Sequence, residues 1–145
     1  MKTSIKRCSV LLLTILLLVM SIAVPLHKAS AAITYNNTFS ADLNCSVNSS
    51  GRLSAQLKVT GISGKTTRIE TELYIEKRFL LVFWNRVSIG YPNDVWTDAV
   101  NATNYNNTFN HDLSSTGTYR VTVTYTVYGT GGSADEITKT ATVTY

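Results

Sequence analysis

Hydrophobic and polar residues alternate one by one through much of the carboxyl-terminal part of the chain. Residues 53–60 read Leu-Ser-Ala-Gln-Leu-Lys-Val-Thr, and the same alternation runs through residues 68–76, 120–128 and 137–145. A period of two places the apolar side chains of a strand on one face and the polar ones on the other, and none of these stretches fits the helical period. One buried face and one wet face predict antiparallel sheets.

Turn-forming residues separate these stretches, as at Asn48–Gly51, Gly61–Gly64, Tyr91–Asp94 and Gly129–Ser133. Glycine, proline and asparagine favour such turns, so their spacing delimits short strands. We expect about seven strands in an all-β sandwich of two packed sheets. Their expected ranges are 41–47, 53–60, 67–77, 82–90, 96–104, 118–128 and 136–145.

The residues before the second-last of these strands resemble a corner of immunoglobulin-like and fibronectin-III-like domains. The run is Leu113-Ser-Ser-Thr-Gly-Thr-Tyr119-Arg-Val121, and Tyr119 matches a tyrosine whose hydroxyl bonds to the chain just upstream. Val121 stands where immunoglobulin domains have a cysteine, so the disulfide is missing. The layout also resembles small, uncharacterised, secreted sandwich proteins of Gram-positive bacteria. The resemblance implies an immunoglobulin-like antiparallel β-sandwich and no activity.

The amino terminus has the features of an export signal. Three basic residues among the first seven are followed by an apolar stretch from Val10 to Val24 and by the small-residue pattern Ala29-Ser30-Ala31. An uncut membrane anchor is the alternative, but the stretch is short for a span of about 20 residues. We therefore expect residues 1–31 to be a cleaved signal peptide and residues 32–145 to be a single secreted domain.

Removal of that signal changes the charge and the cysteine count. Four of the 13 basic residues lie within residues 1–31, which leaves nine, equal to the nine acidic residues. Nucleic acid and anionic lipid both need a concentrated basic surface, so we expect neither as a partner. Cys45 is the one cysteine left, which excludes an internal disulfide. We expect its thiol to be buried, with an intermolecular disulfide as the alternative.

Candidate catalytic and metal-binding chemistry is sparse. His111 is the one histidine outside the signal, and beside Asp112 it could act as the general base of a secreted hydrolase. We expect a polar loop histidine instead, and no enzyme activity. One cysteine and one histidine are too few ligands for structural zinc, and no loop has the spacing of a calcium site. We therefore expect no cofactor.

One apolar run exceeds what a half-wet strand can bury. Phe79-Leu-Leu-Val-Phe-Trp84 has Lys77-Arg78 before it and Asn85-Arg86 after it. If the third and fourth strands form a hairpin, part of this run lies at its tip, and exposed apolar patches usually mark contact with a partner or a membrane. A strand covered on both faces is the alternative. The candidate binding residues are Phe79, Leu80, Leu81, Phe83 and Trp84.

Three further patterns carry weaker expectations. Thr122, Thr124 and Thr126 should pair beside the threonines of residues 138–144, either as a glycan- or ice-binding surface or as a solvated face of residues that favour strands. The glutamates at 70, 72 and 76 should face Arg120 or Lys139 across the sheet. The repeat of Tyr-Asn-Asn-Thr-Phe at residues 35–39 and 105–109 is interpreted as two similar corners that lead into strands.

These observations favour a secreted, non-catalytic binding module that acts at a cell surface through the hairpin at residues 79–84. Its partner would be a protein, the cell wall or a membrane. A hydrolase that uses His111 is one alternative, and a structural envelope protein that associates with itself is another.

Overall fold

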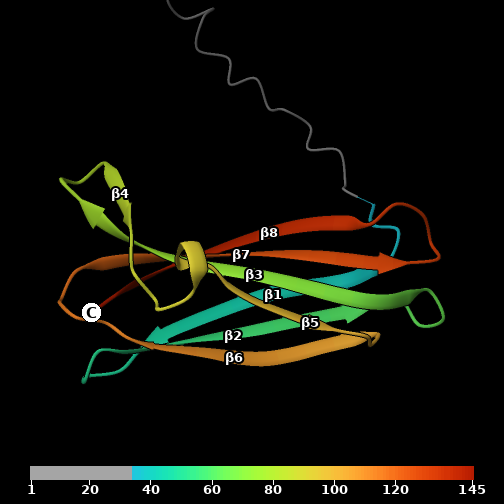
Figure 1. Cartoon of the computed structure of the whole chain (residues 1–145), viewed down its shortest axis with the longest axis horizontal. Coiled ribbons are helices and arrows are strands. Elements are labelled where there is room, and N and C mark those ends of the chain that lie inside the picture. The colour runs from blue at the N-terminus through green and yellow to red at the C-terminus, as the bar shows by residue number, and fades with distance from the viewer. Residues whose placement is uncertain (1–33) are drawn as a thin grey trace, which may run out of the picture. The chain divides into compact units, whose positions relative to one another are not determined.

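The computed structural model describes residues 34–145, which form two antiparallel β-sheets packed face to face (Figure 1). The all-β, sandwich-like fold predicted from the alternation is confirmed. The predicted signal peptide at residues 1–31 lies outside the described residues, as does its cleavage site, so both stay predictions. Across residues 34–145, no helix is long and apolar enough to cross a membrane.

The first sheet has the strand order β1-β2-β6 and the second has the order β4-β3-β7-β8, with β5 also paired to β3. β4 pairs with residues 76–79 of β3 and β5 with residues 69–73, so the two short strands share one edge of β3. A 3₁₀ turn at Pro92–Asp94 precedes β5. The strands are β1 (Thr38–Val47), β2 (Arg52–Gly61), β3 (Thr66–Phe79), β4 (Phe83–Arg86), β5 (Trp96–Val100), β6 (Asn104–Asp112), β7 (Thr118–Gly129) and β8 (Asp135–Thr144).

The expected strand list is wrong in three places. The strand expected at 96–104 ends at Val100, because the chain bends at residues 101–103 before β6 begins. Residues 105–109, expected to be a corner, lie inside β6, where Tyr105 and Phe109 are buried. At residues 35–39 the same letters lead into β1 instead, and there Phe39 is 78% exposed, so the two copies are not equivalent. The strand expected at 82–90 ends at Arg86, because the Ser88 hydroxyl and the Ile89 amide both donate to the Asp94 carboxylate and the chain turns away.

The inward positions of the alternating segments form the core, as the period of two predicts. Leu53, Leu57, Ile69 and Val123 are each 0% exposed. Each such aliphatic side chain contributes about 1.5–3 kcal/mol when it leaves water, so the core stabilises the fold without a disulfide. Tyr125 crosses between the sheets, and its hydroxyl donates to the Asp42 carbonyl at 2.8 Å.

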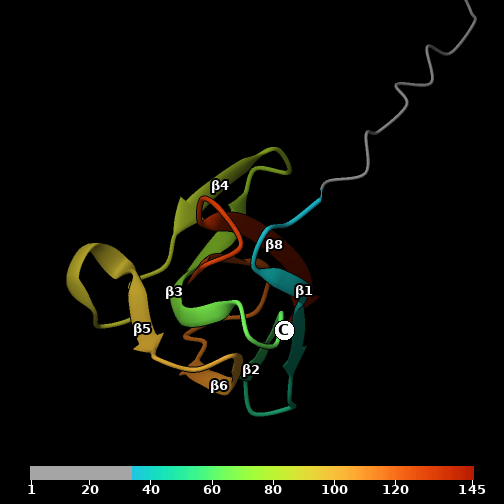
Figure 2. The same ribbon diagram turned by 90° about the vertical axis from the view of Figure 1, so that its right-hand side faces the viewer.

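The two open sides of the sandwich are closed differently, as the view along the strands shows (Figure 2). On one side β5 leaves the edge of β3 toward the other sheet, and the Trp96 ring lies 5.4 Å from the Phe109 ring of β6. On the other side β1 lies against β8. Ring contact and strand contact together keep water out of the space between the sheets.

A buried carboxylate fastens the start of β1 to the β7–β8 hairpin. The Asp135 side chain accepts hydrogen bonds from the backbone amides of Asn36 and Asn37, at 2.8 and 2.7 Å, and from the Thr38 hydroxyl at 2.9 Å. The Asn37 side chain in turn accepts from the Gly131 amide at 3.0 Å. Burial alone would raise the pKa of the Asp135 carboxyl, but the three donors outweigh it and hold that pKa below its ordinary value.

Candidate functional site

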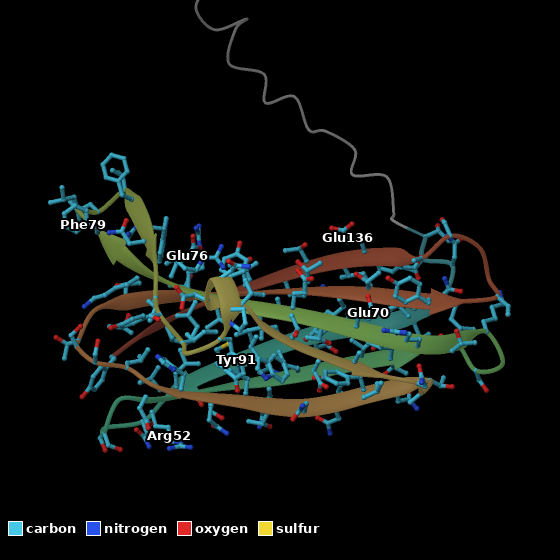
Figure 3. All side chains as sticks on the ribbon, in the orientation of Figure 1. Arg52, Glu70, Glu76, Phe79, Tyr91 and Glu136 are labelled. Carbon is cyan, nitrogen blue, oxygen red and sulfur yellow. The ribbon has the colours of Figure 1, made fainter. Side chains whose placement is uncertain are left out.

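The end of β3 extends beyond the sheet to which it belongs. Its last pair with β7 is Lys77 with Tyr119, whereas Arg78 and Phe79 pair only with Trp84 and Phe83 of β4. The hairpin therefore leaves the sandwich as a two-stranded ribbon, and it projects clear of the two layers (Figures 1 and 3). The hairpin conditionally predicted from the apolar run is confirmed.

The apolar side chains at the tip of this hairpin face solvent. Residues 79 to 83 are 52, 69, 80, 71 and 60% exposed, in chain order. They make up five of the eight large hydrophobic residues that are exposed among residues 34–145. The alternative of a strand covered on both faces is wrong. We call residues 79–83 the apolar tip.

Trp84 differs from the other candidate binding residues because it is half-buried. Its ring lies 4.3 Å from the Arg120 guanidinium and 5.6 Å from that of Arg78. Arg120 is itself fixed by two hydrogen bonds to Glu76, at 2.9 and 2.7 Å, which confirms the expected pairing of that glutamate across the sheet. Cations over an indole face are favourable contacts, so Trp84 attaches the base of the hairpin to the sheet.

The turn at the tip has a backbone that leucine disfavours. Leu80 and Leu81 have φ angles of 47° and 65°, and the Val82 amide donates to the Leu80 carbonyl at 2.7 Å, which makes Leu81 the centre of a γ-turn. A positive φ costs a residue with a side chain about 1–2 kcal/mol, which is why glycine and asparagine usually stand in such turns. Two leucines here give the hairpin apolar surface at the expense of stability.

Three cations surround the base of the apolar tip. Arg86 lies 3.5 Å from the centroid of the Tyr74 ring, and Lys77 donates to the Ser115 hydroxyl at 2.6 Å. Arg78 is exposed, and none of the ion pairs found in residues 34–145 involves these three side chains. From Lys77 to Asn93 the chain carries no carboxylate. We call Lys77, Arg78 and Arg86 the basic collar.

The basic collar changes the interpretation of the neutral net charge. The expectation that anionic partners are disfavoured rests on a net charge of zero, which does not describe how the cations are distributed over the surface. An open groove of about 390 Å³ runs along the base of the hairpin, and all three collar residues line it. The sequence shows these cations on both sides of the apolar run, but the net charge of the whole chain does not show that they cluster.

The structure separates the two residues of the enzyme alternative. His111 and Asp112 are neighbours on β6, so their side chains leave the strand on opposite faces. The Asp112 carboxylate instead lies 3.3 Å from the Arg52 guanidinium, in an exposed ion pair. A histidine general base oriented by Asp112 is therefore not formed. Within the described range, no three histidine, cysteine or acidic side chains gather in a way that could hold a metal ion.

Cys45 and the threonine face behave largely as the alternation predicts. Cys45 is half-buried against the core on the inward side of β1, and burial raises the pKa of its thiol to about 11. The threonines at 122 and 124 stand opposite Thr140 and Thr138, with hydroxyl oxygens 3.4 and 3.2 Å apart. Lys139 does not face the glutamates, because it lies on the other face of β8, opposite Val123.

Sequence reasoning missed a polar hollow on the outer face of the first sheet. It has a volume of about 520 Å³. Its lining alternates with the buried residues of β1, β2 and β6, so it looked like an ordinary wet face. The lining residues are Asp42, Asn44, Gln56, Lys58, Asn106 and Thr108.

Comparison with known proteins assigns no family to the site or to the fold. The chain matches no protein-family model and no curated protein sequence.

Proposed function

We propose that this protein is a secreted, non-catalytic binding module that attaches to a surface outside the cell through the apolar tip of its β3–β4 hairpin. The observation that carries the proposal is the exposure of five successive large apolar side chains, between 52 and 80%, on a ribbon that leaves the sandwich. An isolated patch of this kind serves contact better than it serves folding, because it buries little in the domain itself.

The free energy available from the tip can be estimated from these exposures. Complete burial of a large aliphatic or aromatic side chain contributes about 1.5–3 kcal/mol, so the five partly exposed side chains together offer roughly 5–10 kcal/mol. Association itself costs about 4–15 kcal/mol in lost motion and ordering. The apolar tip alone therefore binds weakly, and a useful affinity needs further contacts from the residues beside it.

We also propose that the sandwich is of the immunoglobulin-like type. The order β1-β2-β6 facing β3-β7-β8 corresponds to strands A-B-E and C-F-G of such domains. The Tyr119 hydroxyl donates to the Ser115 carbonyl just upstream, as the tyrosine of the resembling corner does. β5 departs from that pattern, because it pairs with β3 instead of joining the first sheet. In these domains loops and hairpins at the ends of the sandwich commonly carry the binding residues.

Retention on cell-surface material tests the binding function. The secreted form of the protein, purified from the medium, would be passed over membranes, cell walls and surface proteins from its source organism. We expect one material to retain it, and Phe83→Ser to weaken retention roughly 5- to 30-fold, because about 1–2 kcal/mol of apolar contact is lost.

Phe39→Ser is the matched control for that experiment. Phe39 is 78% exposed but lies at the start of β1, outside the hairpin, so its loss should leave retention unchanged. Equal losses from Phe83→Ser and Phe39→Ser, or no retention on any of the three materials, would contradict the proposal. A molecular mass that rises with concentration and falls back in Phe83→Ser would indicate self-association instead.

A further inference from the structure

We propose that the surface bound by the β3–β4 hairpin is an anionic lipid bilayer, a proposal that rests on the proposed function. The apolar tip enters the region between the lipid headgroups and the acyl chains, and the basic collar contacts the phosphates. Two observations carry this inference together: the exposure of the tip, and the position directly behind it of three cations that take part in none of the ion pairs found in residues 34–145.

The distances along the hairpin match the layers of a bilayer interface. Arg78 directly precedes the apolar tip and Arg86 follows its last residue, Phe83, by three positions, or about 10 Å along a strand at the usual rise. Amphipathic elements on membranes bury their apolar part about 5–10 Å into the boundary of headgroups and chains. When the tip is inserted to that depth, the collar side chains therefore lie at the level of the headgroups.

The collar side chains are free to meet phosphates without breaking a salt bridge. Arg86 rests on the ring of Tyr74, and Lys77 holds a single neutral hydroxyl of Ser115. Glu76 stands opposite Arg86 across the hairpin, but its carboxylate accepts two hydrogen bonds from Arg120, the shorter at 2.7 Å. Guanidinium groups bind phosphate oxygens with paired donors, so an anionic headgroup adds contacts that the protein leaves unmade.

The other occupants suit this surface less well. A second copy joined tip to tip would bring two basic collars together, and like charges at an interface oppose association. A glycan surface offers hydroxyl groups, for which leucine, valine and phenylalanine side chains provide no hydrogen bonds. An anionic bilayer offers both the apolar interior and the negative surface potential that this hairpin complements.

Vesicle binding tests the inference directly. The secreted form of the protein would be mixed with vesicles of phosphatidylcholine alone or of phosphatidylcholine with phosphatidylglycerol, and the bound fraction measured by flotation. Each cation near an anionic surface raises affinity roughly fivefold, so we expect the mixed vesicles to bind roughly 100-fold more tightly and the binding to weaken with salt. Arg78→Gln with Arg86→Gln should weaken it roughly 25-fold.

Two further variants separate charge from insertion. Lys58→Gln with Lys65→Gln removes two exposed cations from β2 and the β2–β3 turn, away from the hairpin, and should leave vesicle binding unchanged. Leu81→Ser should weaken binding to the mixed vesicles roughly tenfold, because Leu81 is the most exposed residue of the tip. Circular dichroism and thermal unfolding would establish that each variant keeps the fold.

Several results would overturn the lipid proposal. Equal affinity for both kinds of vesicle, equal losses from the two double variants, or full binding by Leu81→Ser would each do so. Absence of vesicle binding, combined with retention on surface proteins or cell walls that Phe83→Ser abolishes, would reject the bilayer and leave the binding function standing. Absence of both would reject the two proposals together.

Discussion

The strained turn of the apolar tip gives the sharpest prediction for stability. Replacing Leu80 by Asn and Leu81 by Gly puts into the turn the residue types that its positive φ angles favour. The same change removes two of the most exposed apolar side chains of the hairpin. We expect this double variant to be more stable than the wild type and to bind its target surface more weakly.

The size of the effect follows from the backbone and the burial. Relief of two positive φ angles contributes about 1–2 kcal/mol each. Two effects act against this gain. Glycine lowers the stability by about 0.5–1 kcal/mol because it makes the unfolded chain more flexible, and the loss of each partly buried leucine lowers it by about 0.5 kcal/mol. The free energy of unfolding should therefore rise by about 1 kcal/mol. For a domain of this size that corresponds to roughly 4 °C in the melting temperature.

Equilibrium unfolding in urea, followed by circular dichroism, measures this difference. The matched control is Leu80→Ala with Leu81→Ala, which removes the same apolar surface but retains a β-carbon at both positive φ angles. We expect the Asn-Gly variant to exceed the Ala-Ala variant by about 1–2 kcal/mol. Equal stability of the two double variants would show that the turn is not held in this backbone, and the strain argument would fail.

Three other predictions concern the interior and the strand ends. Asp135→Asn should lower the free energy of unfolding at neutral pH by about 2–3 kcal/mol, because charged hydrogen bonds to three donors are weakened. The pKa of the Asp135 carboxyl is lowered in the folded state from 3.8, so its contribution to stability is present above that value and is lost as the pH falls through the folded pKa. In urea unfolding, the difference in free energy of unfolding between the wild type and Asp135→Asn should therefore be smaller in acid than at neutral pH. With a thiol pKa of about 11 in place of 9.0, Cys45 should react with iodoacetamide roughly 100-fold more slowly in the folded protein than in urea, and equal rates would contradict its burial. Tyr119→Phe should lower the free energy of unfolding by about 1–1.5 kcal/mol, because the hydrogen bond to the Ser115 carbonyl is lost. An unchanged urea midpoint would show that this hydrogen bond does not stabilise the fold.

The fold class could be predicted because alternation is a local signal. Strands β2, β3, β7 and β8 carry apolar residues or threonines at every second position, and each lies close to its expected range. β6 was missed because asparagine and threonine fill the positions between Tyr105 and Phe109, and such residues are typical of turns. Its place beside β2 is decided by long-range pairing, which no local pattern reports.

The candidate site was predictable only in its apolar half. A strand with one buried face can bury only every second residue, so six apolar residues in a row cannot all be buried. This excess of apolar residues indicated the hairpin tip from the sequence. The basic collar depends on which cations lack partners, and this follows from contacts such as that of Glu76 with Arg120 across two strands. Trp84 was assigned to the binding surface because it continues the run, whereas its contacts to two arginines place it at the base of the hairpin.

The carboxylate of Asp135 also bears on when the chain can fold. It is joined to donors 97–99 positions earlier, so the two amides and the hydroxyl that it accepts from stay without this acceptor until nearly the whole chain has been made. Contacts of such sequence separation form slowly, after the local ones. A chain that leaves the cell amino end first would thus cross the membrane before its fold can close, and closure would await the arrival of its final strand on the far side.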